Sequence, residues 1–119
     1  MDRVRPTNVA IHRVAAAMEL GDVQVAIDLG PRIDTTGLPT ERRVRHAIDT
    51  ARAFARRNRV DSVLDTLLTA ERQAPEQVHN HRLSRILVQE LVRRPRPPSR
   101  AIELAARMDA HRIDPSDRP

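Results

Sequence analysis

The chain has 119 residues, a formal net charge of +5 and no cysteine. This length predicts a single domain, and the lack of cysteine excludes disulfides, thiolate metal sites and cysteine nucleophiles. Phe54 is the only residue among Phe, Tyr and Trp, so the core must come from aliphatic and alanine side chains, which suit packed helices better than β-sandwiches.

Apolar residues recur at helical spacing along most of the chain, which predicts an all-α fold of about six helices. In chain order the helices are expected over residues 7–20, 22–30, 41–57, 60–74, 75–93 and 99–110. Their candidate N-cap residues are Thr7, Asp22, Thr40 and Ser99. Pro75 suits a first helical turn. Residues 1–6 are expected to form a flexible N-terminus, 7–112 the helical domain and 113–119 a disordered tail.

Turns of alternating length group the six helices into three antiparallel hairpins. In the middle hairpin, small, apolar and proline residues fall at the positions Ala51, Phe54, Val63, Leu67, Ala70 and Pro75. This pattern resembles a tetratricopeptide repeat, and the first hairpin matches it through Gly21, Val23 and Ala26. The third hairpin matches only through Ala101, Ala105 and Met108. The resemblance implies three stacked helical hairpins with a concave groove.

A second resemblance covers about residues 5–112. Its pattern lies in residues 7–14, 21–23, 47, 51–52, 74–76 and 93–98. It looks like the C-terminal half of actinobacterial transcriptional regulators, which carry an XRE-type helix-turn-helix at their N-terminus. The DNA-reading half is absent here, so the chain is either an excised domain or a short protein that uses the sensor half alone. The resemblance implies a ligand-sensing or dimerisation module in a regulator.

Arginines gather on one face of the expected helix 41–57, with Asp49 among them. One interpretation is a solvated face with ion pairs inside the helix. The other follows from the repeat resemblance and places these arginines in a groove that binds carboxylates or phosphates of a partner. The groove would comprise Arg45, Arg52, Arg56, Asn8 and Glu90, with Ile11, Leu83 and Ile86 beside them.

The histidines do not predict a metal site. His79 and His81 are two residues apart, so on one helix their rings would point about 200° apart. His46 is expected to be half-buried beside an apolar face, and His12 and His111 are isolated in the sequence. No glycine-rich phosphate loop or nucleophile motif is present, so neither a cofactor nor an enzyme activity is expected.

All basic residues other than histidine are arginines, which allows acidic partners. Direct nucleic-acid binding is not expected, because a single phenylalanine cannot supply stacking platforms for bases. No apolar run approaches the roughly 20 residues that cross a bilayer, and the polar start lacks a signal-peptide core, so a cytoplasmic protein is expected.

The function predicted from the sequence is a non-enzymatic regulatory module that binds a protein or peptide, with acidic segments and a second copy of the chain (a homodimer) among the candidates. The alternatives left open are a structural protein–protein adaptor and an arginine-rich nucleic-acid-binding protein.

Overall fold

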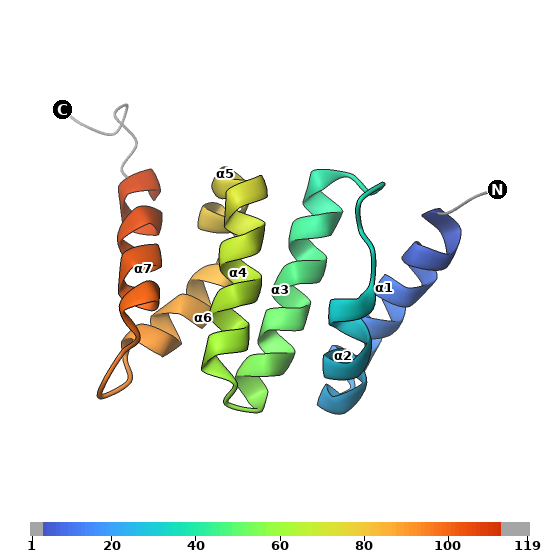
Figure 1. Cartoon of the computed structure of the whole chain (residues 1–119), viewed down its shortest axis with the longest axis horizontal. Coiled ribbons are helices and arrows are strands. Elements are labelled where there is room, and N and C mark those ends of the chain that lie inside the picture. The colour runs from blue at the N-terminus through green and yellow to red at the C-terminus, as the bar shows by residue number, and fades with distance from the viewer. Residues whose placement is uncertain (1–3, 113–119) are drawn as a thin grey trace.

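The computed structural model describes residues 4–112, and this range is all-helical (Figure 1). It contains seven α-helices and one 3₁₀ turn: α1 (Val4–Glu19), α2 (Val23–Leu29), η1 (Gly30–Arg32), α3 (Thr40–Arg56), α4 (Val60–Gln73), α5 (Pro75–Asn80), α6 (Arg82–Val92) and α7 (Ser99–Arg112). The predicted all-α class is confirmed. The expected disordered tail, 113–119, and residues 1–3 of the expected flexible N-terminus lie outside the described residues.

The helix starts follow local backbone chemistry. Asp22 caps α2 as predicted, since its side chain accepts a hydrogen bond from the Val25 backbone N–H. Thr7 does not cap α1, because the helix already begins at Val4. Pro6 fits the first turn of α1, where a missing N–H breaks no helical hydrogen bond. The predicted boundary therefore lay three residues too late.

The prediction of a single helix over residues 75–93 is wrong, because the structure has two helices there, α5 and α6, separated at His81. His81 has an extended backbone with φ −74° and ψ 125°. Its Nδ1 accepts a hydrogen bond from the Leu83 N–H at 3.2 Å, so His81 acts as the N-cap of α6. No proline or glycine marks this break in the sequence, and histidine is not among the preferred N-cap residues.

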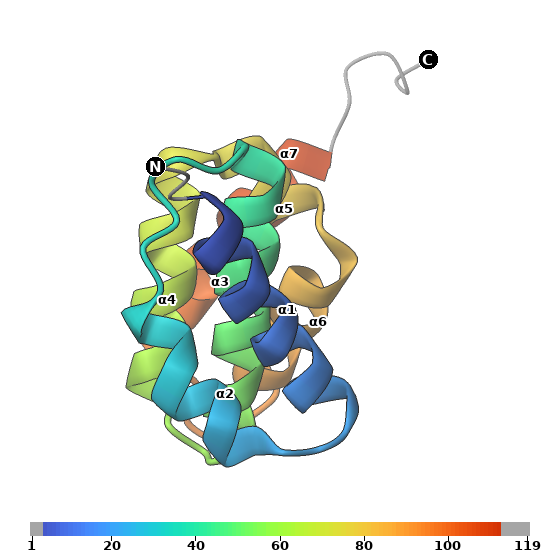
Figure 2. The same ribbon diagram turned by 90° about the vertical axis from the view of Figure 1, so that its right-hand side faces the viewer.

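The helices form a row with α1 and α7 at its two ends (Figure 1). The consecutive pairs α1–α2, α3–α4 and α6–α7 are in contact. Along the row, α4 and α6 contact different sides of α3 (Figure 2). Helix α3 therefore carries two separate surfaces, one toward α6 and one toward η1 and α4.

Two hydrophobic clusters hold the row together. The larger joins α3 to α7, and its most deeply buried large side chains include Ile48, Leu64, Leu67 and Leu104. The smaller joins α1, α2 and the buried Ala53 of α3. Phe54 packs against both clusters. The buried residues are almost all aliphatic or alanine, so the core expected from the composition is confirmed. Fully burying one leucine or isoleucine side chain contributes roughly 1.5–3 kcal/mol.

Candidate functional site

Helices α3 and α6 enclose a groove of about 350 Å³. Its lining residues are Arg52, Ala55 and Arg56 from α3, and Leu83, Ile86, Leu87 and Glu90 from α6. Each set repeats at three- and four-residue intervals, so its members share one helix face. The groove lining therefore combines four apolar side chains with the charged side chains of Arg52, Arg56 and Glu90.

Two arginines of α3, Arg45 and Arg52, pair with one buried carboxylate. Asp49 is 3% exposed, and its Oδ1 lies 3.4 Å from Arg45 Nε and 3.3 Å from Arg52 Nη1. The exposed Arg56 forms no ion pair within residues 4–112. The intrahelical ion pairs expected from the sequence therefore form, and Arg56 is left available on the groove.

Only part of the predicted residue set meets at this groove. Arg52, Arg56 and Glu90 line it, whereas Arg45 and Asn8 do not. Arg45 is seven residues before Arg52, so it lies about two helical turns away along α3. Asn8 belongs to α1, and its buried Oδ1 has no hydrogen-bond partner in the described structure.

Arg45 acts instead on the junction of α5 and α6. Burial lowers the pKa of His81, and the positive charge of Arg45 lowers it further, while Asp49 opposes them. A neutral imidazole keeps a lone pair for the Leu83 N–H. Burial, aided by Arg45, thus favours the neutral ring that caps α6, the helix that forms the far wall of the groove.

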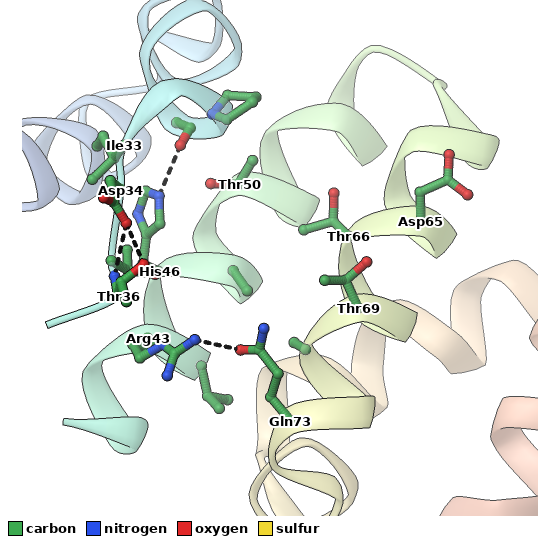
Figure 3. Close-up of a pocket in the computed structure, with 16 residues that line it drawn as sticks. Ile33, Asp34, Thr36, Arg43, His46, Thr50, Asp65, Thr66, Thr69 and Gln73 are labelled. Carbon is green, nitrogen blue, oxygen red and sulfur yellow. Dashed lines mark hydrogen bonds between the residues drawn. The ribbon is translucent and has the colours of Figure 1, made fainter. Parts of the chain in front are cut away.

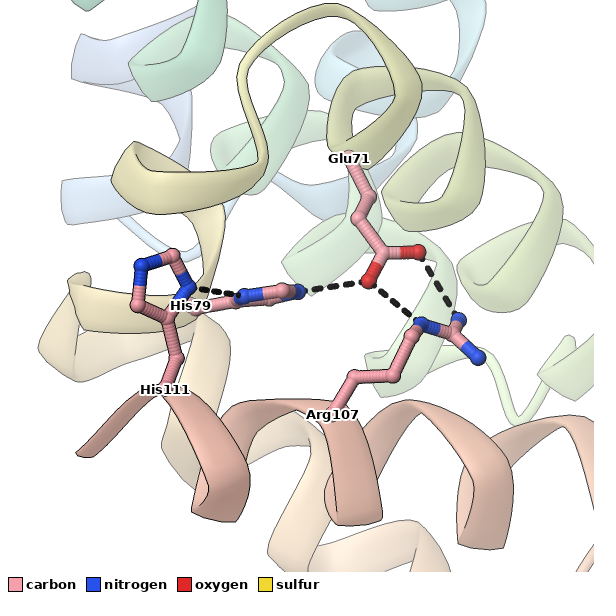
Figure 4. Close-up of polar contacts among 4 residues, drawn as sticks. All are labelled: Glu71, His79, Arg107 and His111. Atoms are coloured by element: carbon pink, nitrogen blue, oxygen red, sulfur yellow. Dashed lines mark hydrogen bonds and ion pairs between the residues drawn. The ribbon is translucent and has the colours of Figure 1, made fainter. Parts of the chain in front are cut away.

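A second polar feature is a closed network between α4, α5 and α7 (Figure 4). Arg107 donates two hydrogen bonds to the Glu71 carboxylate, at 2.7 and 2.8 Å. His79 Nε2 lies 2.5 Å from Glu71 Oε2, and His79 Nδ1 lies 2.7 Å from His111 Nδ1. Because the carboxylate only accepts, His79 Nε2 carries a proton and donates to Glu71, while the two Nδ1 atoms share a second hydrogen bond between the rings.

This network joins two histidines that no sequence pattern connects. His79 is buried, with 6% of its surface exposed, and His111, isolated in the sequence, contacts it. Glu71 and Arg107 are 36 residues apart, so no local spacing could have linked them. Within residues 4–112 no group of three or more His, Cys, Asp or Glu side chains is placed to hold a metal ion.

The network keeps its carboxylate ionised. Burial alone would raise the pKa of Glu71, but the hydrogen bonds and charges of Arg107 and His79 outweigh burial and lower it. The same pairing raises the pKa of Arg107. The network therefore fastens the last helix to the stack through a charged, paired contact.

A pocket of about 480 Å³ lies between the segment 30–36, α3 and α4 (Figure 3). Five threonines are among its lining residues: Thr35, Thr36, Thr50, Thr66 and Thr69. His46 Nε2 is 2.9 Å from the Gly30 carbonyl oxygen, and Arg43 Nη2 donates to Gln73 Oε1 at 2.9 Å. His46 is 6% exposed rather than half-buried.

The sequence did not predict this pocket. The loop after η1 and the spacing of Arg43, His46 and Thr50 on α3 were the available signals, but neither shows that the loop folds back over the helix.

No family model, curated protein or solved structure matches the chain. The resemblances to tetratricopeptide repeats and to the sensor halves of regulators therefore stay predictions from the sequence pattern.

Proposed function

We propose that the chain is a non-enzymatic interaction module that binds an acidic peptide or protein segment in the groove between α3 and α6. The observation that carries the proposal is the position of Arg56, an arginine without an ion-pair partner among the described residues, beside the apolar lining of the groove. An acidic side chain of the partner would accept charge-assisted hydrogen bonds from Arg56.

The apolar lining adds the second half of the recognition. Ile86 is 37% exposed although it is a large hydrophobic residue, and Ala55, Leu83 and Leu87 lie beside it in the groove. Apolar side chains of a partner would bury against this strip, while its carboxylates meet Arg52 and Arg56. A segment that alternates acidic and apolar residues on one helical face fits this combination.

In this proposed module, α1–α2, α3–α4 and α5/α6–α7 form three antiparallel hairpins of the tetratricopeptide type. The burial of Ala51, Val63, Leu67 and Ala70 supports it, because such hairpins need small and aliphatic residues where their helices meet. Since the groove walls belong to neighbouring hairpins, a bound segment would change how the hairpins stack. A regulatory module could transmit binding in this way.

The test is fluorescence anisotropy with a labelled amphipathic peptide that carries Glu and Leu on one helical face. The double variant Arg52→Ala/Arg56→Ala should bind about five- to thirtyfold more weakly, as expected for two partly exposed charged contacts. Wild-type binding should weaken at high salt. Replacing Glu90 by Gln should strengthen binding, because it removes a negative charge of the groove lining that repels the acidic peptide.

The matched control is Arg13→Ala/Arg32→Ala, which removes the same charge from two exposed positions away from the groove. Its affinity should stay close to wild type. If both double variants bound equally weakly, the affinity would depend on the net charge alone, and the proposed groove would be overturned. Unchanged affinity in a folded Arg52→Ala/Arg56→Ala variant, with wild-type circular dichroism, would overturn it as well.

A further inference from the structure

The pocket beside η1 is separate from the groove, although both use α3. Nine residues separate Arg43 from Arg52, a rotation of about 900°, which places them on opposite sides of the helix. In Figure 2, α4 and α6 likewise lie on different sides of α3. The two lining sets share no residue, so the pocket can take its own ligand.

Three polar atoms of the pocket residues have no hydrogen-bond partner in the described structure. They are Arg43 Nε, His46 Nδ1 and Thr50 Oγ1. The three residues follow one another at spacings of three and four, so they form a single stripe on α3. His46 and Thr50 are 6% and 3% exposed. Buried polar groups in proteins are almost always paired, so three unpaired ones in the lining of one cavity point to a ligand.

The hydrogen-bonding roles of these atoms follow from their neighbours. Gly30 offers His46 Nε2 only a carbonyl oxygen, so Nε2 carries the proton and Nδ1 of the neutral ring is an acceptor. Arg43 Nε can only donate, and the Thr50 hydroxyl can do either. A complementary ligand therefore presents an acceptor toward Arg43 and a donor toward His46.

The charges of the pocket leave little attraction for an ion. The Asp65 carboxylate pairs with Arg100 at 2.7 Å. Asp34 accepts hydrogen bonds from the backbone N–H and the hydroxyl of Thr36, at 3.0 and 2.5 Å. Arg43 and Asp34 line the pocket with opposite signs. A carboxylate ligand would also place a second acceptor against His46 Nδ1, so an uncharged ligand fits better.

We propose that this pocket binds a small uncharged molecule through a cis-amide edge, an N–H next to a C=O. The carbonyl oxygen accepts from Arg43 Nε, the N–H donates to His46 Nδ1, and Thr50 supplies a third contact. Val44, Ala47 and Ala70 give the ligand an apolar surface to rest on. The volume of about 480 Å³ lies within the range of small-molecule sites. Lactams, cyclic dipeptides and nucleobases share this edge.

The test is a ¹H–¹⁵N NMR titration of the whole chain with 2-piperidone, cyclo-diglycine and uracil, each beside two controls. N-methyl-2-piperidone keeps the carbonyl but lacks the N–H donor, and acetate carries only acceptors. The amide signals of segments 30–36 and 43–50 should shift with at least one of the three cis-amides and stay in place with both controls. The probe that binds most tightly would show whether the ligand is a lactam, a cyclic dipeptide or a nucleobase.

The variant Thr50→Val keeps the side-chain shape and should lower the affinity of that probe about three- to tenfold, as expected for one lost neutral hydrogen bond. Binding of the acidic peptide should not change, which separates this inference from the groove proposal. Equal binding of N-methyl-2-piperidone, preferential binding of acetate, or no shift with any cis-amide would each overturn the proposal. Wild-type affinity in Thr50→Val would remove the third contact and the proposed orientation with it.

Discussion

The Glu71 network and the pocket beside η1 both bury a histidine among polar groups, yet they differ in how those groups are paired. In the network, Arg107, Glu71, His79 and His111 supply each other with donors and acceptors. In the pocket, one atom each of Arg43, His46 and Thr50 lacks a partner in the described structure. A closed set of hydrogen bonds stabilises a fold, whereas an open set keeps recognition capacity for another molecule.

The comparison predicts the largest stability loss in the closed network. Replacing Glu71 by Gln removes the charge that Arg107 and His79 share, and should lower the free energy of unfolding by about 2–4 kcal/mol. Urea denaturation measures the loss. The control Glu76→Gln changes an exposed glutamate and should stay within about 0.5 kcal/mol of wild type. Equal losses in the two variants would show that the network does not stabilise the packing of α7 against α4 and α5.

The wall of the pocket gives the next largest effect. A Cβ on Gly30 would lie 2.6 Å from Thr50 Oγ1, whereas one on Gly37 would meet no atom within 4 Å. Gly30→Ala should therefore cost about 1–3 kcal/mol through overpacking. Gly37→Ala should be close to neutral.

Adding Thr50→Ala to Gly30→Ala should recover most of the lost stability, because it removes the hydroxyl that clashes. A double-mutant cycle in urea measures this coupling. Additive losses would contradict the close packing of η1 against α3.

The Glu71 network and the His81 N-cap of α6 also predict a pH dependence. The pKa values of Glu71 and His81 are both lowered by folding, so the unfolded chain binds these protons more tightly. Stability from His81 should be complete above its ordinary pKa of about 6.5 and fall below it; that from Glu71 should fall below about 4.3.

Thermal unfolding between neutral and acidic pH measures both steps. His81→Asn keeps an N-cap side chain without a titrating ring and should remove only the step near neutral pH. A variant that retains the full step would rule out His81 as its source.

The smallest effect is expected at the open pocket. Thr50→Val removes a buried hydroxyl that has no partner in the described structure, so the unfolding free energy should be unchanged or rise by up to about 1 kcal/mol. Urea denaturation beside Glu71→Gln shows the contrast directly. A loss of 2 kcal/mol or more, well beyond the ordinary effect of a lost neutral hydrogen bond, would mean that Thr50 already has a structural partner.

The sequence was enough to predict the features that depend on near neighbours. Helical periodicity predicted the all-α class, Asp22 predicted a helix start, and the three- and four-residue spacing placed Arg45 and Arg52 beside Asp49. It could not predict the break at His81, because that cap uses an atypical residue whose ring is kept neutral by burial and by Arg45 on another helix.

The two polar sites were out of reach for the same reason. The partners of Glu71 come from α5 and α7, and the pocket needs the segment 30–36 to fold against α3 and α4. The groove was half predicted, since Arg52, Arg56 and Glu90 meet while Asn8 and Arg45 lie elsewhere. Residues that are far apart in the chain meet only through tertiary packing, which the spacing of nearby residues does not predict.

A long-range ¹⁵N–¹H NMR spectrum of the ¹⁵N-histidine-labelled chain reports which ring nitrogens carry protons in the pocket beside η1 and in the Glu71 network. The variants His46→Asn and His79→Asn assign the signals of the two rings. We expect His46 to be protonated at Nε2 only, and 2-piperidone to move its Nδ1 signal while the His79 signals stay in place. A His46 ring protonated at Nδ1 before ligand is added, or a His46 signal that does not move in the presence of the lactam, would contradict the distinction between the two sites.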